Sequence, residues 1–227
     1  KKLLNDIGGS YYNSSLLNFA AARLAHSLGD NDLAITILTN RPREDGRFPF
    51  YYLDYLEAMS FLYKLDLEAS KRSFIYFIKN FKGSNYIKSA YHKLALIAVL
   101  EGREREKLDL LRQVESKGKV LIDEDKVAFR YANTKQIESL NLLKARLLYD
   151  GGYYQLALNE MQSIEIVENY KFFEEYWYRL ARIKSKLNYD INEVITSYKK
   201  TFDFSKGSFG YFSPMAALQI AFIYEGM

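Results

Sequence analysis

The chain has 227 residues, enough for one large domain or two small ones with a buried core. Hydrophobic residues are 48% and charged residues 26%, which excludes wholesale disorder, and a net charge of +4 is mild for a dedicated nucleic-acid binder. Cysteine is absent, which excludes disulfides, thiolate metal sites and cysteine nucleophiles. Three prolines and twelve glycines supply little turn chemistry, so helices are favoured over many short strands.

Two short segments have the pattern of a joint between paired helices. At Leu28-Gly29 an apolar helical stretch stops, a polar turn follows, and a new helix begins with Ala34 in its first turns. Residues 149–158 repeat this succession, and glycine suits the stop because it adopts the left-handed cap conformation at little cost. Looser repeats of the pattern predict five antiparallel helix pairs and a final single helix, at about residues 11–42, 50–80, 85–116, 137–165, 172–203 and 213–225.

Small residues recur in the first helix of each expected pair. A small side chain lets two helices approach to about 8–10 Å, and one pair cannot bury its apolar faces alone, so pairs stack. We therefore predict an all-α solenoid over residues 1–227, with a recurring alanine at each close contact between helices. The equivalent alanines, at spacings of 36, 37, 50, 36 and 40, are Ala22, Ala58, Ala95, Ala145, Ala181 and Ala221.

The 50-residue step interrupts this rhythm at an irregular connector, residues 117–136. Within it, Asp123, Glu124 and Asp125 precede an apolar-periodic stretch, and acidic side chains stabilise the positive end of a helix. This predicts an extra short helix at about 123–133 that bridges two blocks of repeats. A calcium site at Asp123 and Asp125 is the alternative, but the central glycine and terminal glutamate of a calcium loop are missing.

The run Trp177, Leu180 and Ala181 resembles the first helix of a tetratricopeptide repeat, and Gly152-Tyr153-Tyr154 with Ala157 is similar to that family's turn into its second helix. The resemblance covers nearly the whole chain and implies a right-handed superhelix that binds protein partners on its concave face. The chain departs from the family in its spacings of 36–40, where 34 is usual, and in a terminal proline that recurs only at Pro42. A Sel1-like or other helical-repeat family is the alternative.

The residue after each recurring alanine should turn away from the helix contact, toward the face that the resemblance implies is concave. Three of these residues are arginines, and aromatic residues lie one turn away. Arginine can hold a carboxylate through two hydrogen bonds while rings hold apolar side chains, which favours an acidic or C-terminal-carboxylate peptide as ligand. The alternative is that the arginines are solvated or pair with Glu on neighbouring helices. The predicted partner-binding residues are Phe19, Arg23, Tyr55, Met59, Arg146, Tyr149, Tyr178 and Arg182.

These features predict a non-catalytic scaffold for protein–protein interaction, with no catalytic residue, cofactor or metal. His26 and His92 lack a nucleophile elbow, and Glu174-Glu175 suits a solvated helix face. Two alternatives stay open: a recruitment domain of a longer enzyme such as a protease, and a helical-repeat RNA binder. A salt-dependent interaction with single-stranded RNA would favour the second.

The two ends of the chain and its composition bear on ligand class, membrane insertion, assembly and compartment. Gly8-Gly9-Ser10 follows no strand and precedes no Gly-Lys-Ser/Thr, so a phosphate loop is disfavoured. The longest apolar run is the seven residues 94–100, against about 20 for a membrane span, and no signal peptide is visible in a chain that starts at Lys1 and has the character of a processed or trimmed form.

The helix that Ser213-Pro214 starts is apolar nearly all round, so we expect further chain or another subunit to cover it. Abundant Tyr, Asn, Lys and Phe suit an AT-rich bacterium and favour a periplasmic or cell-envelope protein over a cytoplasmic one.

Overall fold

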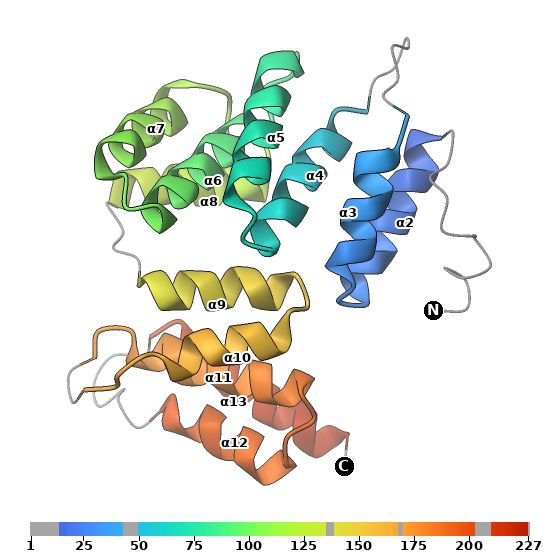
Figure 1. Cartoon of the computed structure of the whole chain (residues 1–227). Helices are drawn as coiled ribbons and strands as arrows, with labels where there is room; N and C mark the ends of the chain where they lie inside the picture. The colour runs from blue at the N-terminus through green and yellow to red at the C-terminus, as the bar shows by residue number, and fades with distance from the viewer. Residues whose placement is uncertain (1–13, 43–49, 135–138, 168–169, 203–209, 227) are drawn as a thin grey trace. The chain divides into compact units, whose positions relative to one another are not determined.

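The computed structural model describes residues 14–42, 50–134, 139–167, 170–202 and 210–226, which form twelve α-helices and no strand (Figure 1). The predicted all-α helical repeat is confirmed. Gly8-Gly9-Ser10 lies outside the described residues. The packing of the chain divides it into two compact units, residues 1–137 and 138–227, and the division follows directly after the predicted connector.

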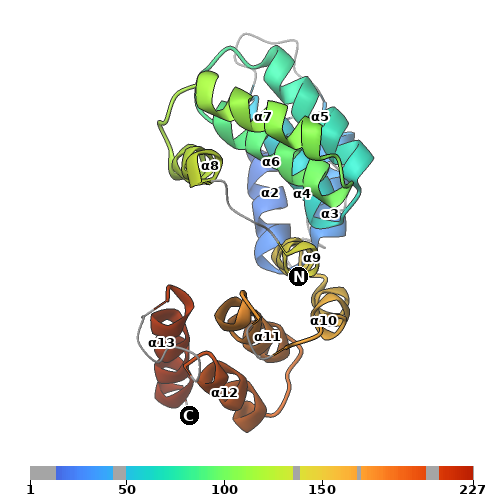
Figure 2. The ribbon, with the colours of Figure 1, turned by 90° about the vertical axis from the view of Figure 1, so that its left-hand side faces the viewer.

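Unit 1 consists of three helix pairs and one single helix. Each pair is joined by a three-residue link, and successive pairs pack on each other, with α3 against α4 and α5 against α6. The last helix, α8, packs on both α6 and α7, and Figure 2 shows it beside them, nearly end-on. The helices of unit 1 are α2 (Ser15–Ser27), α3 (Asn31–Asn40), α4 (Tyr52–Tyr63), α5 (Leu67–Asn80), α6 (Ile87–Leu100), α7 (Glu104–Ser116) and α8 (Asp123–Thr134).

Unit 2 has the same plan with two pairs. The first helix of each pair contacts the first helix of the next, so α9 touches α11 and α11 touches α13, and α13 also packs on α12. Figure 2 shows α9 and α10 side by side, nearly end-on. The helices of unit 2 are α9 (Leu140–Asp150), α10 (Tyr154–Gln162), α11 (Phe173–Lys186), α12 (Ile191–Lys200) and α13 (Phe212–Glu225).

The turn inside each pair uses one residue in the left-handed region. Gly29, Gly102 and Gly152 have φ of 73°, 69° and 82° at this position, where glycine carries no steric cost. Leu65 and Asn188 take the equivalent position with φ of 61° and 56°. The second helix then begins with a side-chain cap in several pairs, for example Asp30 accepting from Leu33 N at 3.1 Å. A common turn therefore fixes how each helix returns along its partner.

The recurring alanines lie where the sequence places close helix contacts. Five of the six predicted alanines are at most 1% exposed: Ala22, Ala58, Ala95, Ala145 and Ala181. The sixth is wrong, because Ala221 is exposed and the buried alanine of α13 is Ala216, which is 0% exposed. Ala216 packs with Tyr178, Ala181, Val194 and Tyr198 in the core of unit 2.

Helix α8 stands where the sequence predicts an extra short helix, but its attachment differs from the expectation of a bridge between blocks. Its buried face carries Ala128 and Ala132, and it packs on α6 as the first helix of a further pair would. The carboxylate of Asp125, itself 0% exposed, accepts from Tyr86 N at 3.0 Å and Ser89 N at 3.1 Å. Asp125 therefore caps the start of α6, whose own N-cap residue provides no side-chain bond.

Helix α6 in turn caps α7. Lys88 is 4% exposed, and its Nζ donates to the carbonyl oxygens of Val114 at 2.6 Å and Glu115 at 3.1 Å, in the last turn of α7. A cation is favourable there because the carbonyl end of a helix carries partial negative charge. The same Nζ lies 5.0 Å from the centre of the Phe129 ring on α8. Buried charges thus join the last three helices of unit 1.

None of the helices in the described part of the chain combines the length and hydropathy that crossing a bilayer requires.

Candidate functional site

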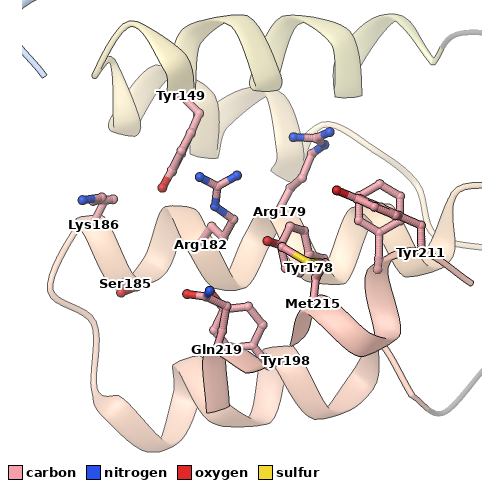
Figure 3. Close-up of a pocket in the computed structure, with 11 residues that line it drawn as sticks. Tyr149, Tyr178, Arg179, Arg182, Ser185, Lys186, Tyr198, Tyr211, Met215 and Gln219 are labelled. Atoms are coloured by element: carbon pink, nitrogen blue, oxygen red, sulfur yellow. The ribbon is translucent and has the colours of Figure 1, made fainter. Parts of the chain in front are cut away.

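A pocket of about 590 Å³ opens on unit 2 where its first helices line up. Helices α9, α11 and α13 each contribute to its lining, and Tyr198 adds a side chain from α12. The pocket contains Tyr149, Tyr178 and Arg182, three of the eight residues that the sequence predicts for partner binding. Figure 3 shows Tyr149 reaching from α9 toward Arg182, with Lys186 and Tyr211 at opposite ends of the pocket.

Arg182 lies against two aromatic rings. Its guanidinium carbon is 4.4 Å from the centre of the Tyr149 ring and 5.8 Å from that of the Tyr178 ring. These contacts are cation–π interactions, which orient a guanidinium without neutralising its charge. Among the described residues, neither Arg182 nor Lys186 takes part in an ion pair. The pocket thus presents two positive charges that no carboxylate of the described chain neutralises.

The other arginines of this region are paired within the protein. Arg179 Nε donates to Glu175 Oε1 at 2.6 Å, and Arg146 Nη1 lies 3.9 Å from the same oxygen. Because Arg146 is on α9 and Glu175 on α11, this pair joins two first helices. Arg146 also lines a narrow space beside Tyr149. The alternative that an arginine bridges to a neighbouring Glu therefore describes Arg146 but not Arg182.

The remaining walls of the pocket are aromatic and apolar. Tyr178 and Tyr198 are 6% and 2% exposed with ring centres 6.0 Å apart, and the Phe212 ring lies 5.4 Å from Tyr178. Burial raises the pKa of Tyr198 well above its usual value, and Tyr178 adds to this while Arg182 opposes it. Burial likewise raises the pKa of Tyr149, against the effect of Arg182. Both phenols therefore stay protonated near neutral pH and can donate or accept hydrogen bonds.

The four predicted site residues of unit 1 do not form such a pocket. Tyr55 is 4% exposed and its hydroxyl lies 2.7 Å from Ser89 Oγ, so it links α4 to α6 in the interior. Met59 is buried at 8% exposure. Phe19 is half-buried against Phe50 and Tyr52, while Arg23 is exposed on α2. In this unit Tyr55 and Met59, which flank the recurring Ala58, pack between helices, whereas Arg23, which follows Ala22, faces outward.

Several residues of the pocket are not among those predicted from the sequence. Arg179 and Lys186 lie three residues before and four residues after the predicted Arg182, so all three share one face of α11, and this spacing is readable in the sequence. Tyr198 comes from a second helix, and Met215 and Gln219 come from a helix that is apolar nearly all round, so the sequence does not distinguish its inward face.

Other candidate groups of the sequence have structural partners. Asp123 is exposed and paired with Lys126 at 2.9 Å, whereas Asp125, on the same helix, is buried against α6, so the two carboxylates do not face one site. His26 Nε2 lies 3.0 Å from both Asn31 Oδ1 and Ser60 Oγ. The His92 ring lies 4.4 Å from that of Tyr131. Within the described ranges, no three His, Asp or Glu side chains gather as metal ligands do.

No protein-family model matches the sequence, and no curated protein matches it. Membership of the tetratricopeptide-repeat family therefore stays a prediction from the residues that carry the resemblance.

Proposed function

We propose that this chain is a non-catalytic scaffold that binds a partner protein or peptide, with the unit 2 pocket as its principal contact. Stacked helix pairs present a row of first helices, and such a row offers a long surface to a partner. The likeness to tetratricopeptide repeats supports this assignment. The proposed setting is a larger assembly in a bacterial cell envelope, which the composition favours.

The observation that carries the proposal is the unneutralised charge of Arg182 beside the pocket. A guanidinium held by Tyr149 and Tyr178, beside a pocket of about 590 Å³, is a recognition group with no partner carboxylate among the described residues. Arginine and tyrosine are also the residue types that concentrate binding energy at protein interfaces. A recruitment domain of a longer enzyme would use the same pocket in the same way, to hold a substrate protein.

Site-specific photocrosslinking in the native source tests the proposal. A photoreactive side chain is placed at Gln219 or Tyr211, which line the pocket, and at the exposed Asn192 on α12 as the matched control. We expect the two pocket positions to capture the same protein and the control position not to capture it. The captured protein, once purified, must bind the purified chain. Equal capture from Asn192, or crosslinks to RNA in place of protein, would contradict the proposed function.

A further inference from the structure

We propose that the unit 2 pocket binds an extended acidic segment in which two side-chain carboxylates flank an apolar residue, with Arg182 and Lys186 as the two anion-binding residues. This inference rests on the proposed function and specifies the chemistry of the partner. It follows from the distribution of charge along α11, from the shape of a matching ligand and from the contrast between the two sides of the pocket.

The first step is the charge pattern of α11. Arg179, Arg182 and Lys186 follow one another along one face, but Arg179 already shares Glu175 with Arg146. Arg182 and Lys186 are four residues apart, which separates them by about 6 Å along a helix that rises 1.5 Å per residue. The unneutralised charges therefore form a pair with a defined spacing.

The second step is the shape of a ligand that matches this spacing. In an extended chain, side chains on the same side are two residues apart, or about 6.6–6.8 Å, close to the spacing of these two positions on α11. A partner helix with carboxylates four residues apart matches the same spacing, but it is about 10 Å wide and presents both carboxylates on one face. An extended segment is narrower, and its alternate side chains can face α11 and α13 at once, the two helices that supply most of the pocket lining.

The third step is the contrast between the two sides of the pocket. The cations lie on α11, whereas Phe212, Met215 and Gln219 come from α13, and Figure 3 shows Met215 and Gln219 away from Tyr149. Alternate side chains of an extended segment point in opposite directions, so carboxylates facing α11 leave the residue between them facing α13. Its apolar side chain would lie against Phe212 and Met215. Gln219 and Ser185 supply the donors and acceptors that the peptide backbone needs.

The probe is a fluorescent eight-residue peptide, Gly-Ser-Asp-Phe-Asp-Phe-Ser-Gly, blocked at both ends, with a twin in which both Asp are Asn. Fluorescence anisotropy gives the Kd of each peptide for the full chain. We expect the Asp peptide to bind at least about tenfold more tightly, as loss of charge-assisted hydrogen bonds typically costs that factor or more. Arg182→Met and Lys186→Met should each raise the Kd about tenfold. Arg105→Met makes the same change at an exposed position on α7 of unit 1 and should leave the Kd unchanged.

Several results would overturn the inference. These are equal binding of both peptides, an equal loss of affinity in Arg105→Met, and no binding of either peptide by the wild-type chain at about 1 mM. Tighter binding by the Asn twin with a free C-terminus than by the blocked Asp peptide would assign the pocket to a terminal carboxylate, and tighter binding by an eight-nucleotide oligouridylate would assign it to RNA. Circular dichroism checks that each variant folds, and Lys186→Met keeps the test open if Arg182→Met does not. A failure here with successful crosslinking from Gln219 would remove the acidic segment and leave the scaffold function standing.

Discussion

Replacing Asp125 tests whether a carboxylate on α8 holds the start of α6. Asp125 is fully buried and accepts the backbone N–H groups of Tyr86 and Ser89 at 3.0 and 3.1 Å. In Asp125→Ala both N–H groups lose their acceptor inside the protein. Each unsatisfied buried group costs about 1–3 kcal/mol, so for these two N–H groups we expect the free energy of unfolding of unit 1 to fall by about 2–6 kcal/mol.

The matched control is Asp123→Ala, two residues earlier on the same helix. Asp123 is exposed in the first turn of α8 and pairs only with Lys126 in the described structure, so its removal should cost much less stability than the removal of Asp125. Urea unfolding measures the loss, and amide hydrogen exchange locates it. Protection should fall at Tyr86 and Ser89 in Asp125→Ala alone. Equal stability of the two variants, with unchanged protection at both amides, would refute the capping role.

This prediction also has a pH dependence. Burial raises the pKa of the Asp125 carboxyl, and the hydrogen bonds from Ser89 and Tyr86 lower it by less. A group whose pKa is raised on folding contributes most stability below its unfolded pKa, and that contribution declines as pH rises through the folded pKa. The difference in unfolding free energy between the wild type and Asp125→Ala should therefore be larger at about pH 4.5 than at about pH 7.5. A difference that grows with pH would contradict the direction of the shift.

Four further substitutions test other parts of the fold by urea unfolding. Gly102→Ala and Gly118→Ala both place a side chain on a residue in the left-handed region, with φ of 69° and 67°, but only the second brings a Cβ to 2.8 Å from Ile87 Cβ. We expect the free energy of unfolding to fall by about 1 kcal/mol in Gly102→Ala and by clearly more in Gly118→Ala. Equal losses would contradict the clash with Ile87. Glu57→Gln removes one carboxylate from the buried Arg41, which keeps Asp54, and should cost about 3 kcal/mol, whereas no loss would show the ion pair to be dispensable. Burial lowers the pKa of His26 below 6.5, so the stability that His26 contributes above its unfolded pKa is lost as the pH falls. The wild type should therefore lose more stability than His26→Gln between about pH 7.5 and 5. Parallel losses in the two proteins would exclude this role.

The helix pairs could be predicted from the sequence because their signals are local. A glycine stop, a short turn and a small residue on the contact face lie within about a dozen residues of one another, and five of six predicted alanines are buried as expected. The sixth failed at α13, since a helix that is apolar nearly all round gives no sign of which face turns inward. Ala216 and Ala221 can be told apart only once α11 and α12 are in place.

The 50-residue step between Ala95 and Ala145 contains a further alanine of the series. Ala132 lies 37 residues after Ala95 and is 6% exposed, so the spacing of unit 1 continues as 36, 37 and 37. Helix α8 is thus in register as a first helix, and the remaining 13 residues lead to Ala145 in unit 2. The cap that Asp125 provides could not be predicted, because it depends on a partner 36–39 residues away in a different helix.

For the candidate site, too, some features could be predicted from the sequence and others could not. The positions after the alanines include Arg182, which lines the pocket, but the same rule also selects Met59, which the structure buries in the interior of unit 1. Which arginine remains unpaired depends on Glu175, a residue of α11 that reaches both Arg146 and Arg179. Sequence spacing can show that arginines share a face, but only the packed helices determine which of them is neutralised.

The hydrogen bonds between successive pairs have a consequence for how the chain folds. His26 reaches Ser60, Tyr55 reaches Ser89, and Lys71 reaches Glu106, across 34 or 35 residues in each case. These partners are all supplied by the next pair along the chain. Closing loops of one repeat length costs less entropy than joining distant segments, and chains rich in such contacts fold quickly. Each pair can therefore dock on its predecessor as it leaves the ribosome, and α6 acquires its N-terminal cap only when Asp125 has been synthesised.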